Sequence, residues 1–496
     1  TAYEISLGLV GAEMCIRDRD MYLYEVSSPG LYRQSYLLKL TSDLSDNSKL
    51  VYSFYNGNME GTTLSRGGGT SIMNDVWDLA SQVNSSGFTM PWRLYTNEYW
   101  APTEVKNSTH GLKYTRFINN DAFFDLLLKI DSKDYITGHG ARRDTVMTYP
   151  IFGAGDDLWI ADEAPVGFFG GPLFSVEGRL AFGGAISTSR DSSTVRTVTF
   201  KGNYTRQLNN NHQLKTGGEL VLSKLDLKYG SQNEFLPSGN YWSLMDVNPY
   251  RLSFFVQDKL EYKGFVAIAG LNLDVLNPNS EWYVIDNYDD DFFSSNYTAA
   301  AEETFETIGL DPQLQLSPRL ALSHPITETS KLYFNYGHYQ QMPIAQDLYR
   351  VRRGFSEEVL TIGDPTLAMA NTIAYEIGFD QSFLESYLIH ISAYYKDISD
   401  QQDYTKFISA NSKVNYYRLT ANSYEDIRGF ELELSRVRGE WLTGFMNYEY
   451  RVNTSGYFGL GRYYENPSDQ RNYELNNEKQ YKPRPIPVSY THLTLP

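Results

Sequence analysis

The segment from Thr372 to Lys396 constrains the fold most, because its apolar side chains recur at every second residue. Successive side chains of a β-strand point to opposite faces, so each half of this segment has one apolar face and one polar face. A short polar turn at Ser382 to Ser386 separates the halves, whose apolar positions are Ile373, Tyr375, Ile377 and Phe379, then Tyr387, Ile389, Ile391, Ala393 and Tyr395. The pattern recurs along the chain, which predicts an all-β fold: a transmembrane antiparallel β-barrel with lipid outside and water inside.

Composition agrees with strands, rather than helices, crossing the membrane. No uncharged apolar run approaches the roughly 18 to 20 residues that a transmembrane helix needs, and the best run, Gly264 to Leu273, predicts a strand. The 40 tyrosines outnumber the 26 phenylalanines, and tyrosine suits pleated surfaces and membrane–water interfaces. A negative mean hydropathy fits a barrel, because only alternate residues face lipid.

Charge and cysteine content exclude several classes of function. A net charge of −17 disfavours nucleic acid as a partner, since phosphate backbones bind clusters of Lys and Arg. The acids indicate either a solvated surface or a carboxylate-lined lumen suited to cationic or hydroxyl-rich solutes. The single cysteine, Cys15, excludes an intrachain disulfide and a cysteine metal cluster. With no phosphate loop, zinc-spaced histidines or nucleophile elbow, we expect no catalytic, cofactor-binding or metal-ligating residues.

Seven hairpins with short polar turns can be traced, giving about 14 strands. They are Tyr36–Leu44 with Lys49–Asn56, Gly111–Ile118 with Ala122–Ile130, Val195–Leu208 with His212–Leu227, Leu252–Tyr262 with Phe265–Leu276, Pro318–Pro325 with Lys331–Tyr339, the pair within Thr372–Lys396, and Ile427–Arg436 with Trp441–Arg451.

The connections between these hairpins are much longer: residues 57–110, 131–194, 228–251, 277–317, 340–371 and 397–426. Short turns alternating with long loops are typical of outer-membrane barrels, whose short turns face the periplasm. A soluble propeller or sandwich is the alternative. Propellers repeat at a fixed period, whereas these hairpins start at irregular intervals and share no blade motif.

Both ends of the chain differ from its interior. Residues 1–20, TAYEISLGLVGAEMCIRDRD, and residues 488–496, VSYTHLTLP, resemble translated sequencing-adapter sequence. We therefore expect both segments, including Cys15, to be non-native, and residues 21–484 to be a partial barrel. The alternative is that both are genuine terminal segments.

Five segments, in the expected order, resemble the barrel of TonB-dependent outer-membrane receptors: residues 255–279, 317–350, 363–381, 393–400 and 427–436. In GDPTLAMANTIAYEIGFDQ (363–381), Asp364 stands where the family usually has Asn, and Leu367-Ala368-Met369 replaces the common Leu-Lys-Pro. The resemblance covers most of residues 30–480.

The resemblance implies a 22-stranded barrel with an N-terminal plug domain inside it. With about 14 strands traced and no plug found, we expect an incomplete barrel. By resemblance, the parent protein is an outer-membrane receptor for active uptake of a scarce solute such as a siderophore, cobalamin or glycan. Its implied partners are outer-membrane lipid, a TonB-type energy-transducing complex reached through the missing N-terminal region, the small-molecule or glycan ligand, and a surface lipoprotein in some glycan systems.

The loop at 277–317 supplies the candidate ligand-binding residues, because aromatic and acidic side chains interleave there. The candidates are Trp282, Tyr283, Tyr288, Asp289, Asp290, Asp291, Phe292 and Tyr297. Aromatic rings beside carboxylates suit carbohydrate or chelate capture, and they equally suit simple packing of the loop. The acids, which include Asp286, Glu302, Glu303 and Glu306, fit no calcium-loop template.

A second function class is a secreted β-rich polysaccharide-binding protein or glycoside hydrolase. Its candidate acids are Glu431 and Glu433, which share one face of a strand roughly 7 Å apart. Glycosidase carboxylates can have that spacing. The same polar face recurs in most hairpins, however, so a polar barrel lumen explains the pair more simply.

Overall fold

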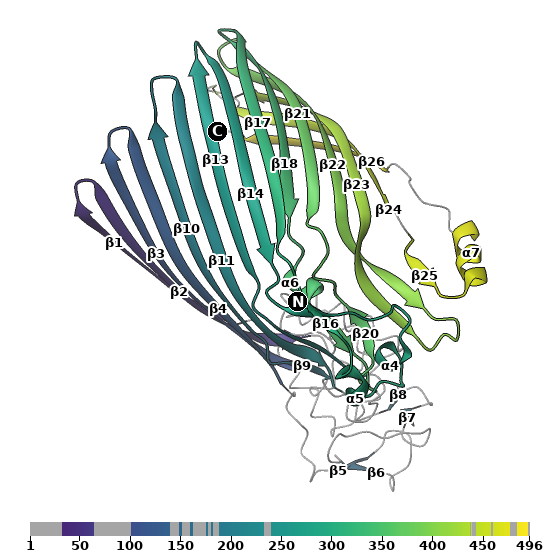
Figure 1. The fold of residues 1–496 in the computed structure, drawn as a ribbon. Helices are drawn as coiled ribbons and strands as arrows, with labels where there is room; N and C mark the ends of the chain where they lie inside the picture. The colour runs from purple at the N-terminus through teal and green to yellow at the C-terminus, as the bar shows by residue number, and fades with distance from the viewer. Residues whose placement is uncertain are drawn as a thin grey trace.

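The structure of the protein is a computed structural model. The structure describes residues 32–63, 101–138, 188–232, 240–436, 438, 443–457 and 460–476, together with the backbone of short strands between 148 and 181 and of the strand at 484–494. Most of this is one large curved sheet, with the shorter elements gathered mainly at one of its ends (Figure 1).

All seven predicted hairpins are present, and their strands are the wall of the sheet. The wall strands are β1 (Tyr32–Ser45), β2 (Ser48–Thr63), β3 (Ala101–Asn119), β4 (Ala122–Thr137), β10 (Thr194–Gln207), β11 (His212–Ser231), β13 (Tyr250–Tyr262), β14 (Phe265–Asn277), β17 (Gln313–Thr327), β18 (Ser330–Gln341), β21 (Ala370–Phe383), β22 (Tyr387–Ile408), β23 (Asn415–Arg436), β24 (Thr443–Tyr457) and β26 (Arg484–Thr494). Each pairs antiparallel with the next in this order.

Short turns lie at one end of the wall, the turn end, and long connections lie at the other, the loop end (Figure 1). The turn between β13 and β14 has only two residues. Lys263 and Gly264 have φ values of 50° and 83°, as a two-residue turn with positive φ at both positions requires. Glycine is suited to such a turn because it has no Cβ to clash.

The two faces of the wall differ as the alternation predicts. Leu112, Leu128 and Phe200 are register partners on neighbouring strands, and 41–49% of each is exposed. This apolar face is called the outward face. On the inward face Glu219 forms two ion pairs: its Oε1 lies 2.5 Å from Arg251 Nη2, and its Oε2 lies 3.3 Å from Lys201 Nζ. In the middle of the wall, these residues thus present apolar side chains outward and an ion-paired cluster inward.

The predicted loop at 397–426 is wrong, because most of it is strand. β22 and β23 are each 22 residues long and leave only residues 409–414 between them. Their pairing is interrupted by register shifts between Ile398 and Gln401 and between Gln401 and Asp403. These irregularities, and the polar composition around them, hide the period of two on which the sequence prediction relied.

The shorter elements mostly belong to the loop connections. They are β5 (Thr148–Pro150), β6 (Trp159–Ala161), β7 (Ser175–Val176), β8 (Leu180–Ala181), β9 (Ser189–Asp191), β12 (Tyr241–Val247), β15 (Glu281–Tyr283), α4 (Asp290–Phe293), α5 (Ala299–Glu302), β16 (Thr307–Gly309), α6 (Ala345–Leu348), β19 (Val351–Arg353), β20 (Val359–Ile362), β25 (Arg462–Tyr464) and α7 (Pro467–Asn476). Within the described residues, no helix has the length and apolar character needed to span a bilayer.

Three of these short strands bridge distant parts of the wall. β12 pairs with the loop-end half of β11 and also with β19, β19 pairs with β20, and β20 pairs in parallel with β23. In sequence these pairings join residues near 230 to residues near 417. The loop connections are therefore hydrogen-bonded into the main sheet.

Of the two segments expected to be non-native, residues 1–20, with Cys15, lie outside the described residues. Part of residues 488–496 lies in β26, whose backbone pairs with β24 from Arg484↔Asn453 to Thr494↔Thr443. This strand extends the wall by one beyond the predicted hairpins.

Candidate functional site at the loop end

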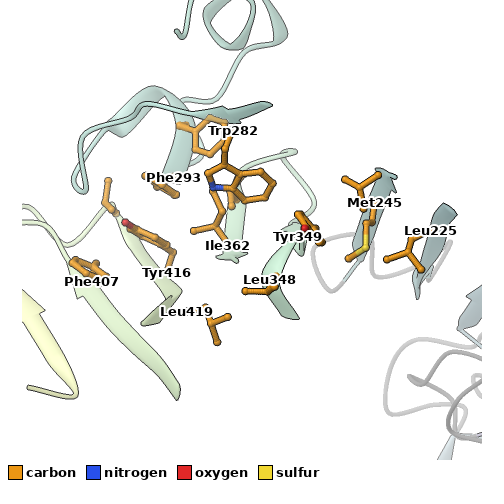
Figure 2. Packing of buried hydrophobic residues seen from close by; sticks show 14 residues of the cluster. Leu225, Met245, Trp282, Phe293, Leu348, Tyr349, Ile362, Phe407, Tyr416 and Leu419 are labelled. Atoms are coloured by element: carbon orange, nitrogen blue, oxygen red, sulfur yellow. The ribbon is translucent and has the colours of Figure 1, made fainter. Parts of the chain in front are cut away.

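Large side chains from four loop connections and from the ends of β11, β22 and β23 meet in a buried cluster, the loop-end core (Figure 2). Phe293 stacks on Tyr416 with ring centroids 3.7 Å apart, and Phe292 packs edge-on against Phe293 at 4.9 Å. The members are Leu225, Met245, Val247, Trp282, Phe292, Phe293, Leu348, Tyr349, Val359, Ile362, Phe407, Val414, Tyr416 and Leu419. The loop end is therefore packed like the interior of a soluble domain.

The aromatic candidates from the sequence all come together here, with different exposure. Trp282 in β15 and Phe292 in α4 belong to the loop-end core, 8% and 0% exposed. Tyr283 and Tyr288 are half-buried against the core. Tyr297, also half-buried, lies at the edge of the same segment. Trp282 and Phe292 present almost no ring surface, so for these two the geometry is that of loop packing.

The three acidic candidates surround the start of α4. Asp289 caps this helix, and its side chain accepts a hydrogen bond from the Phe292 amide at 2.9 Å. Asp290 accepts one from Asn296 Nδ2 at 2.6 Å, whereas Asp291 is exposed. Within the described part of the chain, no group of three or more His, Cys, Asp or Glu side chains is placed to hold a metal ion.

A polar network that the sequence prediction missed centres on Glu302 and Arg353. Arg353 Nη2 lies 2.6 Å from Glu302 Oε1, with the two side chains 10% and 18% exposed. Tyr283 Oη donates to Glu302 Oε1 at 2.8 Å, and Tyr297 Oη donates to Glu302 Oε2. The guanidinium of Arg353 also lies over the Tyr297 ring, 5.2 Å from its centroid. The network joins β19 to the segment between β14 and β17.

The pKa values of this network favour a charged carboxylate beside neutral phenols. Burial alone would raise the pKa of Glu302, but hydrogen bonds from Tyr297, Tyr283 and Arg353 outweigh it and hold this pKa below its usual range. Burial, together with the hydrogen bond to Glu302, raises the pKa of Tyr283 to about 12. Glu302 is therefore ionised and Tyr283 neutral at physiological pH.

Two further arginines fasten neighbouring connections. Arg350 donates to Tyr229 Oη at 3.2 Å and to Tyr404 Oη at 3.4 Å. Arg418 of β23 lies 3.1 Å from Asp364 and donates to Asn287 at 2.9 Å. In the sequence, the basic run Arg350, Arg352 and Arg353 could have indicated that this segment forms ion pairs or hydrogen bonds. It could not have identified the partners, because these lie far away in sequence.

The inward wall contains a hollow of about 420 Å³ that is lined by both polar and apolar side chains. Its lining includes Glu219, Arg251, Asn272, Asp274 and Arg319. Asn272 Nδ2 donates to Asp274 at 2.5 Å, and the Arg319 guanidinium lies 4.7 Å from the centroid of the Tyr339 ring. The hollow presents charges of both signs to the lumen.

Glu431 and Glu433, the acids of the glycosidase alternative, are part of this polar inward face. Glu431 is in register with Ser392 and Glu449, and Glu433 with His390 and Asn447. Glu449 accepts a hydrogen bond from Tyr394 Oη at 2.7 Å. The pair continues a ladder of polar side chains along the wall.

Comparisons with known proteins agree with this wall. The sequence model of the TonB dependent receptor-like β-barrel family matches residues 32–487. The Serratia marcescens hemophore receptor HasR, solved as a double mutant with its hemophore HasA and heme, is similar at a TM-score of 0.50 and 13% identity, over 86% of this chain and 54% of that chain.

Two further solved structures are the Neisseria meningitidis FrpB iron transporter (F5-1 variant) and the Yersinia pestis ferric yersiniabactin uptake receptor FyuA. FrpB has a TM-score of 0.49 and 14% identity over 87% of this chain and 54% of that chain. FyuA has a TM-score of 0.48 and 10% identity over 86% of this chain and 52% of that chain. This chain thus spans about half the length of the solved structures it matches, and no curated protein matches it.

The family match covers nearly the whole wall, from the first residue of β1 into β26. It confirms the resemblance that five sequence segments indicated, and the antiparallel order of the strands is the one expected of such a barrel. This chain belongs to the TonB-dependent receptor-like β-barrel family.

Proposed function

We propose that this chain forms the wall and the outer ligand-contact surface of an outer-membrane receptor for TonB-dependent uptake of a scarce solute. The observation that carries the proposal is the pairing of an apolar outward face with a packed, hydrogen-bonded loop end on one sheet. A wall of this kind suits lipid, and an ordered loop end suits recognition outside the cell. The role is transport, with no catalytic step.

In this proposal the turn end faces the periplasm. Contact with the TonB-type energy-transducing complex is assigned to an N-terminal plug region of the parent receptor, outside residues 21–484. A surface lipoprotein would be a further partner if the solute is a glycan.

The loop end favours a cationic or hydroxyl-rich solute, within the range of siderophores, cobalamin and glycans. Asp286 and Asp291 are exposed, and half-buried Tyr288, Asp289 and Asp290 lie beside them. Carboxylates that reach solvent can accept hydrogen bonds from solute hydroxyl or ammonium groups. Trp282 and Phe292 would act beneath this surface by holding its shape, while Tyr283 and Tyr297 orient Glu302.

Uptake by the receptor containing this chain, expressed in a Gram-negative host, tests the proposal. Labelled cyanocobalamin, a ferric hydroxamate siderophore and a maltodextrin serve as probes, with and without a protonophore. We expect outer-membrane fractionation and energy-dependent uptake of one probe. Recovery as a soluble periplasmic protein, or no energy-dependent uptake of any probe, would contradict it.

A matched pair of variants tests the ligand surface. Asp291→Asn removes an exposed carboxylate of α4, whereas Asp311→Asn removes one that is exposed near the start of β17. We expect the first to weaken uptake several-fold and the second to leave it unchanged. Equal uptake by both variants would remove the α4 surface from the ligand site and leave transport itself intact.

A further inference from the structure

The outward face of β10 and β11 carries a pair of cations at the border of the apolar belt. Arg196 and Lys224 are direct register partners on these two strands. Toward the turn end, the next outward pair along the ladder is Val198 and Leu222. Both cationic side chains are exposed. The pair thus lies where the apolar surface ends.

Alternation along the strands fixes the face on which the two cations lie. Their neighbours Val195 and Leu225 are also register partners, and they point to the inward side: Leu225 belongs to the loop-end core and Val195 packs against it. Arg196 and Lys224 must therefore point away from the core, toward the surroundings of the wall. They share this face with Phe200 and Leu222, which are 49% and 47% exposed.

Among the described residues, the register partners of these two cations are each other and Ser132 of β4, so no acid lies directly opposite either of them. Neither cation forms an ion pair within 4.0 Å in the part of the chain that the structure describes. The nearest outward acids are Asp134 and Asp226, both register partners of Thr194, which is the next outward residue of β10 toward the loop end. Asp134 accepts a hydrogen bond from Thr194 Oγ1 at 2.9 Å. Like charges directly opposite each other destabilise a sheet, so an external anion would stabilise this one.

The position selects the chemistry of that anion. At the border of the lipid-facing belt the surroundings of a barrel change from acyl chains to headgroups, where lipid phosphates lie. Arginine binds a phosphate through two parallel N–H donors, and lysine adds a compact point charge. Because the whole chain carries a net charge of −17, general attraction of anions does not explain such binding.

We propose that Arg196 and Lys224 form a binding site for the phosphate of a lipid headgroup in the outer leaflet around the wall. The site is separate from the solute surface at α4, although it requires the membrane location proposed above. It would fix the depth of the wall in the membrane and hold lipid beside the loop end.

Lipid selectivity of the receptor containing this chain tests the site. The receptor is reconstituted into phosphatidylcholine vesicles, and electron spin resonance measures the association of spin-labelled phosphatidic acid relative to spin-labelled phosphatidylcholine. The test variant is Arg196→Gln with Lys224→Gln. The matched control, Lys113→Gln with Lys215→Gln, removes the same charge from exposed inward positions on β3 and β11. Heat-modifiable electrophoresis confirms that each variant is folded.

We expect the preference for phosphatidic acid at this site to fall about fivefold for each outward cation removed and about 30-fold for both, with no change in the control. Equal loss in both double variants would reduce the effect to bulk charge and overturn the proposal. An unchanged preference in the test variant would also overturn it. Competition by inorganic phosphate at the concentration of the lipid phosphate would show a free-phosphate site, and the lipid assignment would fail.

Discussion

In the wall, large apolar side chains such as Ile377 and Leu432 are 49% and 37% exposed, whereas at the loop end Phe292 and Tyr416 are fully buried. Among the described residues, the buried apolar cluster lies at the loop end. The rest of the wall is a sheet one layer thick, whose apolar face needs lipid as its packing partner. The loop end buries its apolar surface against itself, as a soluble domain does.

This difference assigns separate sources of stability to the two regions. Backbone pairing and the surrounding bilayer hold the wall. Side-chain packing and a few buried polar contacts hold the loop end, where β12, β19 and β20 link it to β11 and β23. Substitutions should therefore damage one region without the other, and the following variants test that separation.

The largest effect is expected for Phe292→Ala in the loop-end core. Removing this fully buried ring should lower the stability of the loop end by about 3–5 kcal/mol and leave the stability of the wall unchanged. Hydrogen exchange of residues 281–309 should rise strongly while heat-modifiable migration of the barrel is retained. Ile308→Ala, in the β15–β16 ladder of the same connection but 48% exposed, is the control and should change exchange little. Loss of barrel migration in Phe292→Ala would contradict the separation.

Outward substitutions in the wall should have the next largest effect. Ile377→Arg and Leu432→Arg each place a charge in lipid, which costs about 2–4 kcal/mol near the middle of the bilayer. The folded fraction in outer-membrane extracts should fall. Glu376→Arg and Glu433→Arg, on the inward face of the same strands, should be milder, although Glu376 loses a hydrogen bond from Tyr333 at 2.9 Å. Equal damage on both faces would refute the inside–outside assignment.

Arg353→Gln should loosen the loop end by a smaller amount. The variant leaves Glu302 with only its tyrosine donors, and hydrogen bonds to charged groups contribute about 1.5–3 kcal/mol. Exchange of the Val284 amide, which bonds to the Glu306 carbonyl at 2.9 Å, should rise. Arg352→Gln removes a neighbouring cation that lies over the Tyr241 ring and should matter less. If both variants raise exchange equally, Glu302 is not the anchor of this segment.

The wall was predictable from sequence because its signal is local. A period of two and short polar turns fix a hairpin such as β13–β14 within about thirty residues of chain, and this prediction held for all seven hairpins. The loop end was not predictable in the same way. Its contacts join residues far apart in sequence, such as Glu302 with Arg353 and Tyr229 with Arg350.

The candidate residues show the same limit. Sequence identified a segment rich in aromatic and acidic residues, but it could not distinguish the buried Trp282 and Phe292 from the exposed Asp291. Burial there is decided by β20, β22 and β23, whose Ile362, Phe407 and Tyr416 join the same core. Which of these residues are exposed therefore depended on the three-dimensional arrangement.

The smallest expected effect is a dependence of loop-end order on pH. Ionised Glu302 is favoured in the folded state, because its hydrogen bonds from Tyr297, Tyr283 and Arg353 outweigh burial and lower its pKa. Its contribution is therefore complete above the unfolded pKa of about 4.3 and is lost as pH falls through the lowered value. Burial raises the pKa of Tyr283 to about 12, so its neutral form contributes fully below about 10 and is lost as pH rises through about 12.

Loop-end order should thus be constant between about pH 5 and pH 10 and decline on both sides. Trp282 lies buried in the loop-end core (Figure 2). Its ring centroid is 6.0 Å from that of Tyr283, so its fluorescence reports this order as the difference between the receptor and its Trp282→Phe variant. Glu302→Gln cannot ionise, so it should abolish the acid limb of the profile. Tyr283→Phe should weaken the alkaline limb in the same way. An acid limb that persists unchanged in Glu302→Gln would mean that another carboxylate holds the segment between β14 and β17 in place.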